Sequence, residues 1–192
     1  MERSVTRDEP AVKGQTLNSF LKFVATKLTP EQRSELIAVV PAELRPYVER
    51  GGVLPTQVIP MSVLNRLTEQ AARLAGEPLP QFARQAGRFS AGEAVRGVYR
   101  FFARVLTPDA LLGRAASMWT AMNTVGRMEI ERQAERAAVI RLLNFPSEAV
   151  MCARIGGWID QMIELTGTTK YIVVQTQCVA NGDPCCEWKL TW

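Results

Sequence analysis

The sequence predicts an α+β fold, in which a helical N-terminal half packs on a four-stranded antiparallel sheet near the C-terminus. Apolar residues recur at helical spacing over most of residues 16–125. After Gly126 the spacing changes to the alternation that is typical of strands. A helical half followed by strand, strand, helix, strand and strand indicates one antiparallel sheet covered by helices.

The chain is expected to form one domain. Its 192 residues are enough to bury a core without a disulfide or a metal. Residues 1–15 carry no apolar periodicity, so they predict a flexible tail ahead of a domain over 16–192. This domain consists of a helical part, 16–125, and a sheet-containing part, 126–192.

The first helices are predicted from apolar spacing and from the residues that start and end them. Residues 17–28 form the first helix, and the segment from Thr29 supplies an N-cap and a first-turn proline for the second. A short third helix covers 41–48. Residues 53–60 are an extended connection, because their two prolines argue against a central strand.

Four more helices complete the helical part. Residues 61–74 form a strongly amphipathic helix that ends before a glycine. Two helices follow at 80–88 and 91–105, separated near Ser90. The last runs over 108–123, after a threonine N-cap and a first-turn proline.

The sheet is expected from four strand-like runs with a helix between the second and the third. These runs are residues 128–134, 138–145, 171–179 and 187–192. The first pair turns near Glu135, and the second pair turns at the Asn181-Gly-Asp-Pro segment. The intervening helix covers 146–165.

Composition excludes several classes of function. The chain has no histidine, which removes histidine acid-base catalysis, Ser-His and Cys-His nucleophiles, histidine-ligated haem and zinc sites that use imidazole. The net charge is +4, but lysine and arginine never form a run of four, so nucleic-acid binding is not expected.

Location is inferred from apolar runs and from the N-terminus. No apolar run approaches the roughly 20 residues that span a bilayer, so no membrane span is expected. The N-terminus lacks the apolar core of a secretion signal, and the expected location is the cytoplasm.

Three cysteines are spaced so that the fold can bring them together. Cys152 lies in the predicted helix, Cys178 near the end of one strand, and Cys186 at the start of its partner. Because the helix packs on that sheet, the three sulfurs can converge, and thiolates are good zinc ligands. The alternative is that they are small buried hydrophobic residues.

Two segments carry a resemblance to a known family, Cys152-Ala-Arg-Ile-Gly-Gly-Trp and Cys178-Val-Ala-Asn-Gly-Asp-Pro-Cys-Cys-Glu-Trp. Residues 126–192 resemble the 4-vinyl reductase domain, which is the sensory module of regulators that detect aromatic pollutants. The whole chain is similar to an uncharacterised family that is much duplicated in myxobacteria. The resemblance implies a fold shared with haem-nitric-oxide-binding domains and with vesicle-tethering subunits.

The resemblance also implies a zinc site. In the pollutant sensors, three cysteines and a glutamate hold zinc at a spacing similar to that of Cys152, Gln175, Cys178 and Cys186. Gln175 replaces the glutamate with a poorer ligand, which leaves Gln175, Cys185 or water as the fourth ligand. Haem is not expected, because the haem relatives hold their iron through a histidine.

An apolar pocket between the helices and the sheet is implied as well. Each candidate wall residue would serve equally as an ordinary core residue. The candidates are Phe101, Phe102, Trp119, Met122, Met128, Ile130, Phe145 and Trp158.

The function expected from these features is a non-catalytic sensory domain. It would bind an apolar or aromatic small molecule and could form a homodimer. A protein-interaction or assembly subunit, as among the vesicle-tethering relatives, is the alternative. An accessory factor of tetrapyrrole metabolism is suggested by the family name alone, and a fold does not carry an activity with it.

Overall fold

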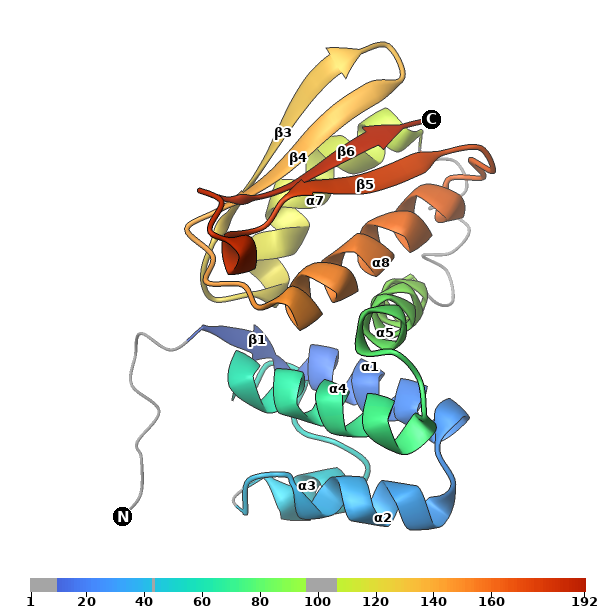
Figure 1. Cartoon of the computed structure of the whole chain (residues 1–192), viewed down its shortest axis with the longest axis vertical. Helices are drawn as coiled ribbons and strands as arrows, with labels where there is room; N and C mark the ends of the chain where they lie inside the picture. The colour runs from blue at the N-terminus through green and yellow to red at the C-terminus, as the bar shows by residue number, and fades with distance from the viewer. Residues whose placement is uncertain (1–9, 43, 96–106) are drawn as a thin grey trace.

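A computed structural model describes residues 10–42, 44–95 and 107–192, and it confirms the α+β fold class. The described residues form seven helices, a four-stranded antiparallel sheet in the C-terminal half and a second sheet of two strands. Figure 1 shows these elements stacked in layers, with the larger sheet at one end and α2 and α3 at the other. No helix in the described ranges is long and apolar enough to cross a membrane.

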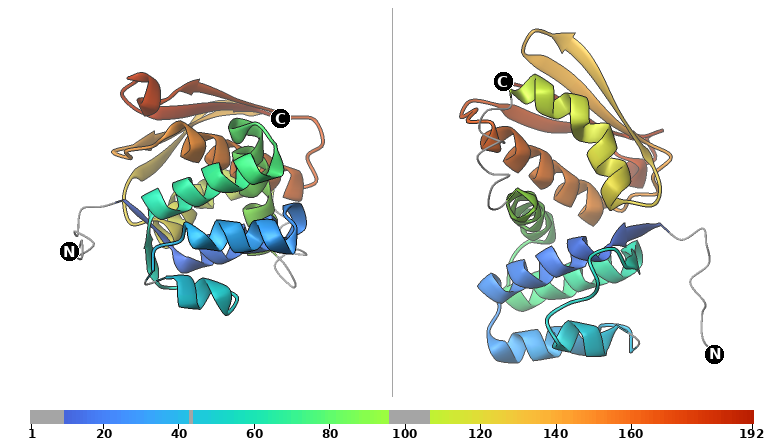
Figure 2. Two further views of the ribbon diagram at one scale, coloured as in Figure 1. Left: turned by 60° about the horizontal axis from the view of Figure 1, so that its bottom comes forward. Right: turned by 180° about the vertical axis from the view of Figure 1, so that it is seen from behind.

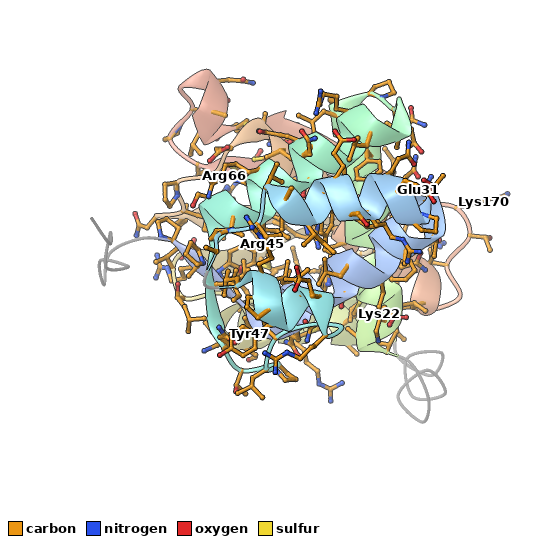
Figure 3. All side chains as sticks on the ribbon, turned by 90° about the horizontal axis from the view of Figure 1, so that it is seen from below. Lys22, Glu31, Arg45, Tyr47, Arg66 and Lys170 are labelled. Atoms are coloured by element: carbon orange, nitrogen blue, oxygen red, sulfur yellow. The ribbon has the colours of Figure 1, made fainter. Side chains whose placement is uncertain are left out.

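Five helices build the N-terminal half. They are α1 (Gly14–Lys27), α2 (Pro30–Ala38), α3 (Arg45–Glu49), α4 (Met61–Ala75) and α5 (Leu79–Ala94). The start of α2 is a capping box, in which Thr29 and Gln32 each accept a backbone N–H of the other through a side-chain oxygen. Arg45 of α3 lies beneath α2 in Figure 3 and donates from Nη2 to the carbonyl oxygen of Ala38 at 3.0 Å.

Ordered structure begins earlier than the expected tail boundary at residue 15. Strand β1 (Ala11–Lys13) pairs antiparallel with β2 (Val58–Pro60), which lies in the expected extended connection. Both strands are sheet edges, where a terminal proline is tolerated. Ala11 and Val12 are buried. Two apolar residues are too few to produce a periodic signal, so the pattern of the sequence does not show them.

One expected helix boundary is wrong. Helix α5 continues through Ser90, where two separate helices were predicted. Ser90 is buried, and its Oγ accepts a hydrogen bond from Nη2 of Arg154 at 3.1 Å. This polar residue therefore belongs to a helix contact rather than to a turn. Most of the expected helix 91–105 falls outside the described residues.

The C-terminal half has the predicted order of elements. It contains α7 (Pro108–Met122), β3 (Arg127–Ala134), β4 (Ala137–Leu143), α8 (Ala149–Leu165), β5 (Ile172–Gln177) and β6 (Cys186–Thr191). The strand order is β3-β4-β6-β5, so β6 lies between β4 and β5. The two views of Figure 2 show α7 and α8 along one side of this sheet.

Helices α5 and α8 approach so closely that their backbones touch. A Cβ atom added at Gly87 would lie 1.9 Å from the carbonyl oxygen of Arg154. One added at Gly157 would lie 1.9 Å from the carbonyl oxygen of Arg84. Real Cβ atoms do not come this near to backbone, so these two glycines permit the contact that joins the two halves of the molecule.

Candidate functional site

A cavity of about 70 Å³ lies where the N-terminal segment meets α5, α7 and α8. Its wall is mostly apolar and includes four methionines. The residues of the wall are Val12, Thr16, Gly87, Ser90, Ala115, Met118, Trp119, Met122, Asn123, Met128, Met151, Arg154, Ile155 and Trp158. Both halves of the chain contribute to it, so neither half encloses the cavity alone.

Four of the residues predicted from sequence lie in this wall: Trp119, Met122, Met128 and Trp158. Ile130 and Phe145 do not. Phe145 is buried behind Trp119, with the two rings at 83° and their centroids 4.9 Å apart. Ile130 packs on the core from β3, opposite Ile140.

Phe101 and Phe102, the remaining candidates for the pocket wall, lie outside the described residues. The structure therefore places neither of these two side chains.

A smaller cavity of about 20 Å³ lies deeper, between α7, α8 and the sheet. The two cavities have four wall residues in common: Ala115, Met118, Met128 and Trp158. These side chains separate the two spaces. Methionine has three rotatable bonds and adapts its shape readily, so a wall made of it can yield to a ligand.

Arg154 is the charged residue of the cavity wall, and sequence reasoning did not select it. Its side chain is 5% exposed. Nη2 donates to Ser90, the guanidinium lies 5.3 Å from the centre of the Phe20 ring, and Nη1 has no partner among the described residues. Burial lowers the pKa of Arg154 to about 10, which leaves the group charged at neutral pH.

The other arginines at the α5–α8 contact have carboxylate partners. Arg84 donates from Nε and Nη2 to both oxygens of Asp160, at 2.7 and 3.0 Å. Arg88 donates to Glu164, and this hydrogen bond is the main reason that the pKa of the Glu164 carboxyl is lowered. Arg154 differs from both, because no described carboxylate forms an ion pair with it.

Two more polar atoms of the same wall have no partner within the part of the chain that the structure describes. They are Oγ1 of Thr16 on α1 and the indole Nε1 of Trp158 on α8. Buried polar groups usually find a hydrogen-bond partner. Three unpartnered atoms around one cavity indicate a place where polar atoms of another molecule can bind.

The sequence contains a signal for Arg154 that can be seen in retrospect. It is the one charged residue between Glu148 and Asp160, a stretch that is otherwise apolar apart from two glycines. A charge on the buried face of a helix requires a partner or a function. Helical periodicity alone does not show which side of α8 faces the cavity.

The three cysteines Cys152, Cys178 and Cys186 converge near the start of α8, where Cys152 follows Met151 of the cavity wall. Sγ of Cys152 lies 3.4 Å from Sγ of Cys178 and 3.3 Å from that of Cys186. All three sulfurs lie within 4.8 Å of one another, and all three residues are buried. Sulfurs that share a tetrahedral zinc ion at ~2.3 Å are about 3.8 Å apart, so the arrangement is close to that of a metal site.

The two residues considered as fourth ligands have other partners. Nε2 of Gln175 donates to the carbonyl oxygen of Gln177 at 3.0 Å, and the Cys185 thiol donates to Oε1 of Gln177 at 3.3 Å. Oγ of Ser147, which sequence reasoning missed, lies 3.0 Å from Sγ of Cys152. This hydroxyl is an oxygen atom in hydrogen-bond contact with the cluster.

Hydrogen bonding within the cluster separates the cysteine pKa values. The hydrogen bond between Cys152 and Cys186 raises the pKa of Cys152 far above its usual range, and burial adds to this effect. The same hydrogen bond lowers the pKa of Cys186. Burial raises the pKa of Cys178. Cys186 is therefore the first thiol of the cluster to ionise.

No protein-family model and no curated protein sequence matches this chain. Solved structures do. An H-NOX protein from S. oneidensis in the Fe(II)NO state is 12% identical, has a TM-score of 0.73, and aligns over 93% of this chain and 97% of its own. An unliganded Fe(II) H-NOX protein from K. algicida is 11% identical with a TM-score of 0.68, over 93% and 95%. A structure from work on haem distortion in the H-NOX family is 14% identical with a TM-score of 0.72, over 94% of both chains.

These likenesses correct the expectation of no haem. The solved structures that share this fold belong to haem proteins, so the exclusion is wrong. It rested on the absence of histidine, but other proteins hold haem iron through cysteine, methionine or tyrosine. A missing histidine removes one axial ligand and not the cofactor. At these identities the comparisons establish architecture: the chain has the fold of the H-NOX domains.

Proposed function

We propose that this protein is a non-catalytic, small-molecule-binding sensory domain whose ligand occupies the cavity between α1, α5, α7 and α8. The observation that carries the proposal is the cavity itself, an apolar space whose wall has three polar atoms without a partner among the residues that the structure describes. Ligand sites are commonly apolar clefts with a few convergent polar groups, located where parts of a fold meet.

The chemistry of the wall favours binding over catalysis. Arg154 is the one titratable side chain among its described residues. An arginine that stays charged at neutral pH cannot exchange a proton with a substrate there. The wall therefore offers shape, apolar contact and a positive charge. The resemblance of residues 126–192 to the 4-vinyl reductase sensory module supports the same function.

Haem belongs among the ligands to be tested, because the fold is that of haem proteins. In place of histidine, the wall offers the thioethers of Met118, Met122, Met128 and Met151, and methionine is an axial ligand in cytochromes c. Bound haem would supply iron that can take a gas ligand. The cavity of about 70 Å³ is smaller than an engineered cavity of about 150 Å³ that holds benzene, so haem would have to displace wall side chains.

Filling the cavity tests the proposal. Ala115 lies in the wall of both cavities, whereas Ala116 is its exposed neighbour on α7. Butyramide and toluene are followed by ligand-observed NMR, and haemin by its absorption spectrum. At least one of the three should bind saturably to the wild type and to Ala116→Leu, but not to Ala115→Leu. No binding to the wild type, or equal binding to both variants, would contradict the proposal.

We also infer that the cysteine cluster is a structural zinc site. The support is the convergence of three buried sulfurs, from α8, from the residue that follows β5 and from the first residue of β6. A metal there would fasten the helix to the sheet, and binding to the folded state alone stabilises a protein.

The zinc site has a natural control in the adjacent cysteine. Cys186→Ser removes a ligand, while Cys185→Ser removes a thiol outside the cluster. Metal analysis should find about one zinc per chain in the wild type and in Cys185→Ser, and much less in Cys186→Ser. Chelation should lower Tm by several degrees for the first two proteins only. Equal zinc content in both variants would rule the site out.

A further inference from the structure

Arg154 is a buried charge with no opposite charge paired to it among the described residues. Its guanidinium donates a hydrogen bond to Ser90 and lies over the ring of Phe20, and both of these groups are neutral. Taking a guanidinium out of water without a counter-charge is unfavourable by several kcal/mol, and a buried ion pair is usually needed to offset that loss. A residue that only packed α8 against α5 would be more stable as an apolar side chain.

The guanidinium of Arg154 lies in the wall of the cavity in which we propose that the ligand binds. Arg154 lies on α8 where α8 crosses α5, and α1 packs on the other side of α5 (Figure 1). Its Nη1, Oγ1 of Thr16 and Nε1 of Trp158 have no hydrogen-bond partner in the described ranges, and all three belong to residues of one cavity wall. Each of these atoms can donate a hydrogen bond.

We propose that Arg154 anchors the carboxylate of a small organic acid, whose apolar part contacts the methionines of the cavity wall. This inference rests on the proposed function and names the chemical class of its ligand. The bound carboxylate supplies the counter-charge that Arg154 lacks, and Trp158 donates to it from Nε1.

A carboxylate suits this site better than other groups do. The planar guanidinium matches the two oxygens of a carboxylate, and a monoanion balances the single positive charge. A phosphate dianion would leave a second charge buried. An amine would be repelled. The rest of the wall is apolar and the volume is about 70 Å³, which favours a short aliphatic chain.

The test compares ligands that have the same shape and a different charge. The probes are butyrate and butyramide, then benzoate and benzamide, with affinities measured by ligand-observed NMR titration at neutral pH. For the wild type, we expect at least one acid to bind roughly tenfold or more tightly than its amide, as a charge-assisted hydrogen bond predicts.

Variants at position 154 test whether the guanidinium causes the preference for the acid over its amide. Arg154→Met keeps a long apolar side chain and should bring the acid-to-amide ratio close to one. Arg154→Lys keeps the charge and should retain part of the preference. Arg114→Met makes the same substitution at an exposed position of α7 and should leave the ratio unchanged.

The stability of Arg154→Met provides a second readout. If Arg154 had a purely structural role, its replacement would lower the stability of the ligand-free protein. Without ligand, Arg154→Met should be at least as stable as the wild type in urea unfolding, because it removes an unbalanced buried charge. Addition of butyrate or benzoate should raise the Tm of the wild type and not that of Arg154→Met.

The outcomes separate the anchor from the pocket. If acid and amide bind the wild type equally, the cavity binds ligands and the Arg154 anchor is wrong. A preference that persists in Arg154→Met also overturns the anchor. If none of the four probes binds the wild type, this inference fails, and the binding function fails with it only when toluene and haemin do not bind either. An acid preference that is lost in Arg154→Met and kept in Arg114→Met supports the anchor.

Discussion

At the scale of single residues, the environment of each charged group decides its role. Arg84, Arg88 and Arg141 all face carboxylates, and Arg154 faces a cavity. In the sequence, Arg154 differs from the other three as the one charge in an otherwise apolar stretch, but the partners of all four are not visible there. Their difference arises from the fold, because an arginine without an opposite charge can be identified only when its neighbours in space are known.

Glu187 shows the opposite case, a buried carboxylate whose partners are complete. It is 6% exposed on β6, where Oε1 accepts from Oγ1 of Thr176 and Oε2 accepts from Nε of Arg141, each at 2.7 Å. The hydrogen bond from Thr176, followed by that from Arg141, lowers the pKa of this carboxyl. The ionised form therefore stabilises the folded state.

Glu187→Gln should consequently destabilise the protein in a pH-dependent way. The stabilisation by the carboxylate is present above the pKa of an unfolded glutamate, about 4.3, and disappears as the pH falls through the lower folded-state pKa. At pH 7 the variant should lose about 1 kcal/mol, a difference that shrinks in acid. Urea unfolding from pH 7 to pH 3 measures it, with Glu135→Gln, at an exposed position in the turn between β3 and β4, as control. A pH-independent difference would contradict this account.

At the scale of elements, the crossing of α5 and α8 holds the two halves of the molecule together. Gly87 and Gly157 bring each backbone against the other, and Arg84 pairs with Asp160 across the contact. Glycine lowers the helix propensity at these positions, but this loss is small compared with the destabilisation that the overlap of a side chain with the other backbone would cause. Their role is to leave room.

Gly157→Ala should separate the helices and destabilise the protein by about 2–3 kcal/mol, since the new Cβ would overlap the carbonyl oxygen of Arg84. Gly113→Ala is the matched control, because nothing lies within 4 Å of its added Cβ on α7. It should stabilise by about 0.5–1 kcal/mol through helix propensity. Thermal and urea unfolding of both variants check the sign. Similar effects at both sites would show that α5 and α8 are not in backbone contact.

At the scale of the whole molecule, the cavity exists because two halves of the chain meet. Val12 and Thr16 reach it from the N-terminus, and the backbone N–H of Thr124 donates to the carbonyl oxygen of Ala11 at 3.1 Å. The N-terminal strand is thereby fastened to the segment between α7 and β3. A ligand in the cavity would therefore contact residues of both halves.

Met118 separates the two cavities, so its removal should join them. Met118→Ala should lose about 1–2 kcal/mol of stability, less than a fully buried methionine would, and should admit longer ligands. Ligand-observed NMR with amides from butyramide to hexanamide measures this length limit. Met122→Ala, which enlarges only the first cavity, is the control. An unchanged length profile in Met118→Ala would show that the cavities stay separate.

The sequence by itself determined the fold class, the four strands and their turns, and the convergence of Cys152, Cys178 and Cys186, because local periodicity, turn residues and spacing are properties of the chain. The pocket was implied by the family resemblance, and of its eight candidate residues Trp119, Met122, Met128 and Trp158 lie in the wall of the cavity. Only the tertiary structure decided that Ser90 lies within a helix, that β1 is a strand, and that Phe145 lies behind the wall. It also decided the role of Arg154, since the partner of a buried charge depends on contacts between residues far apart in sequence, which no local pattern encodes.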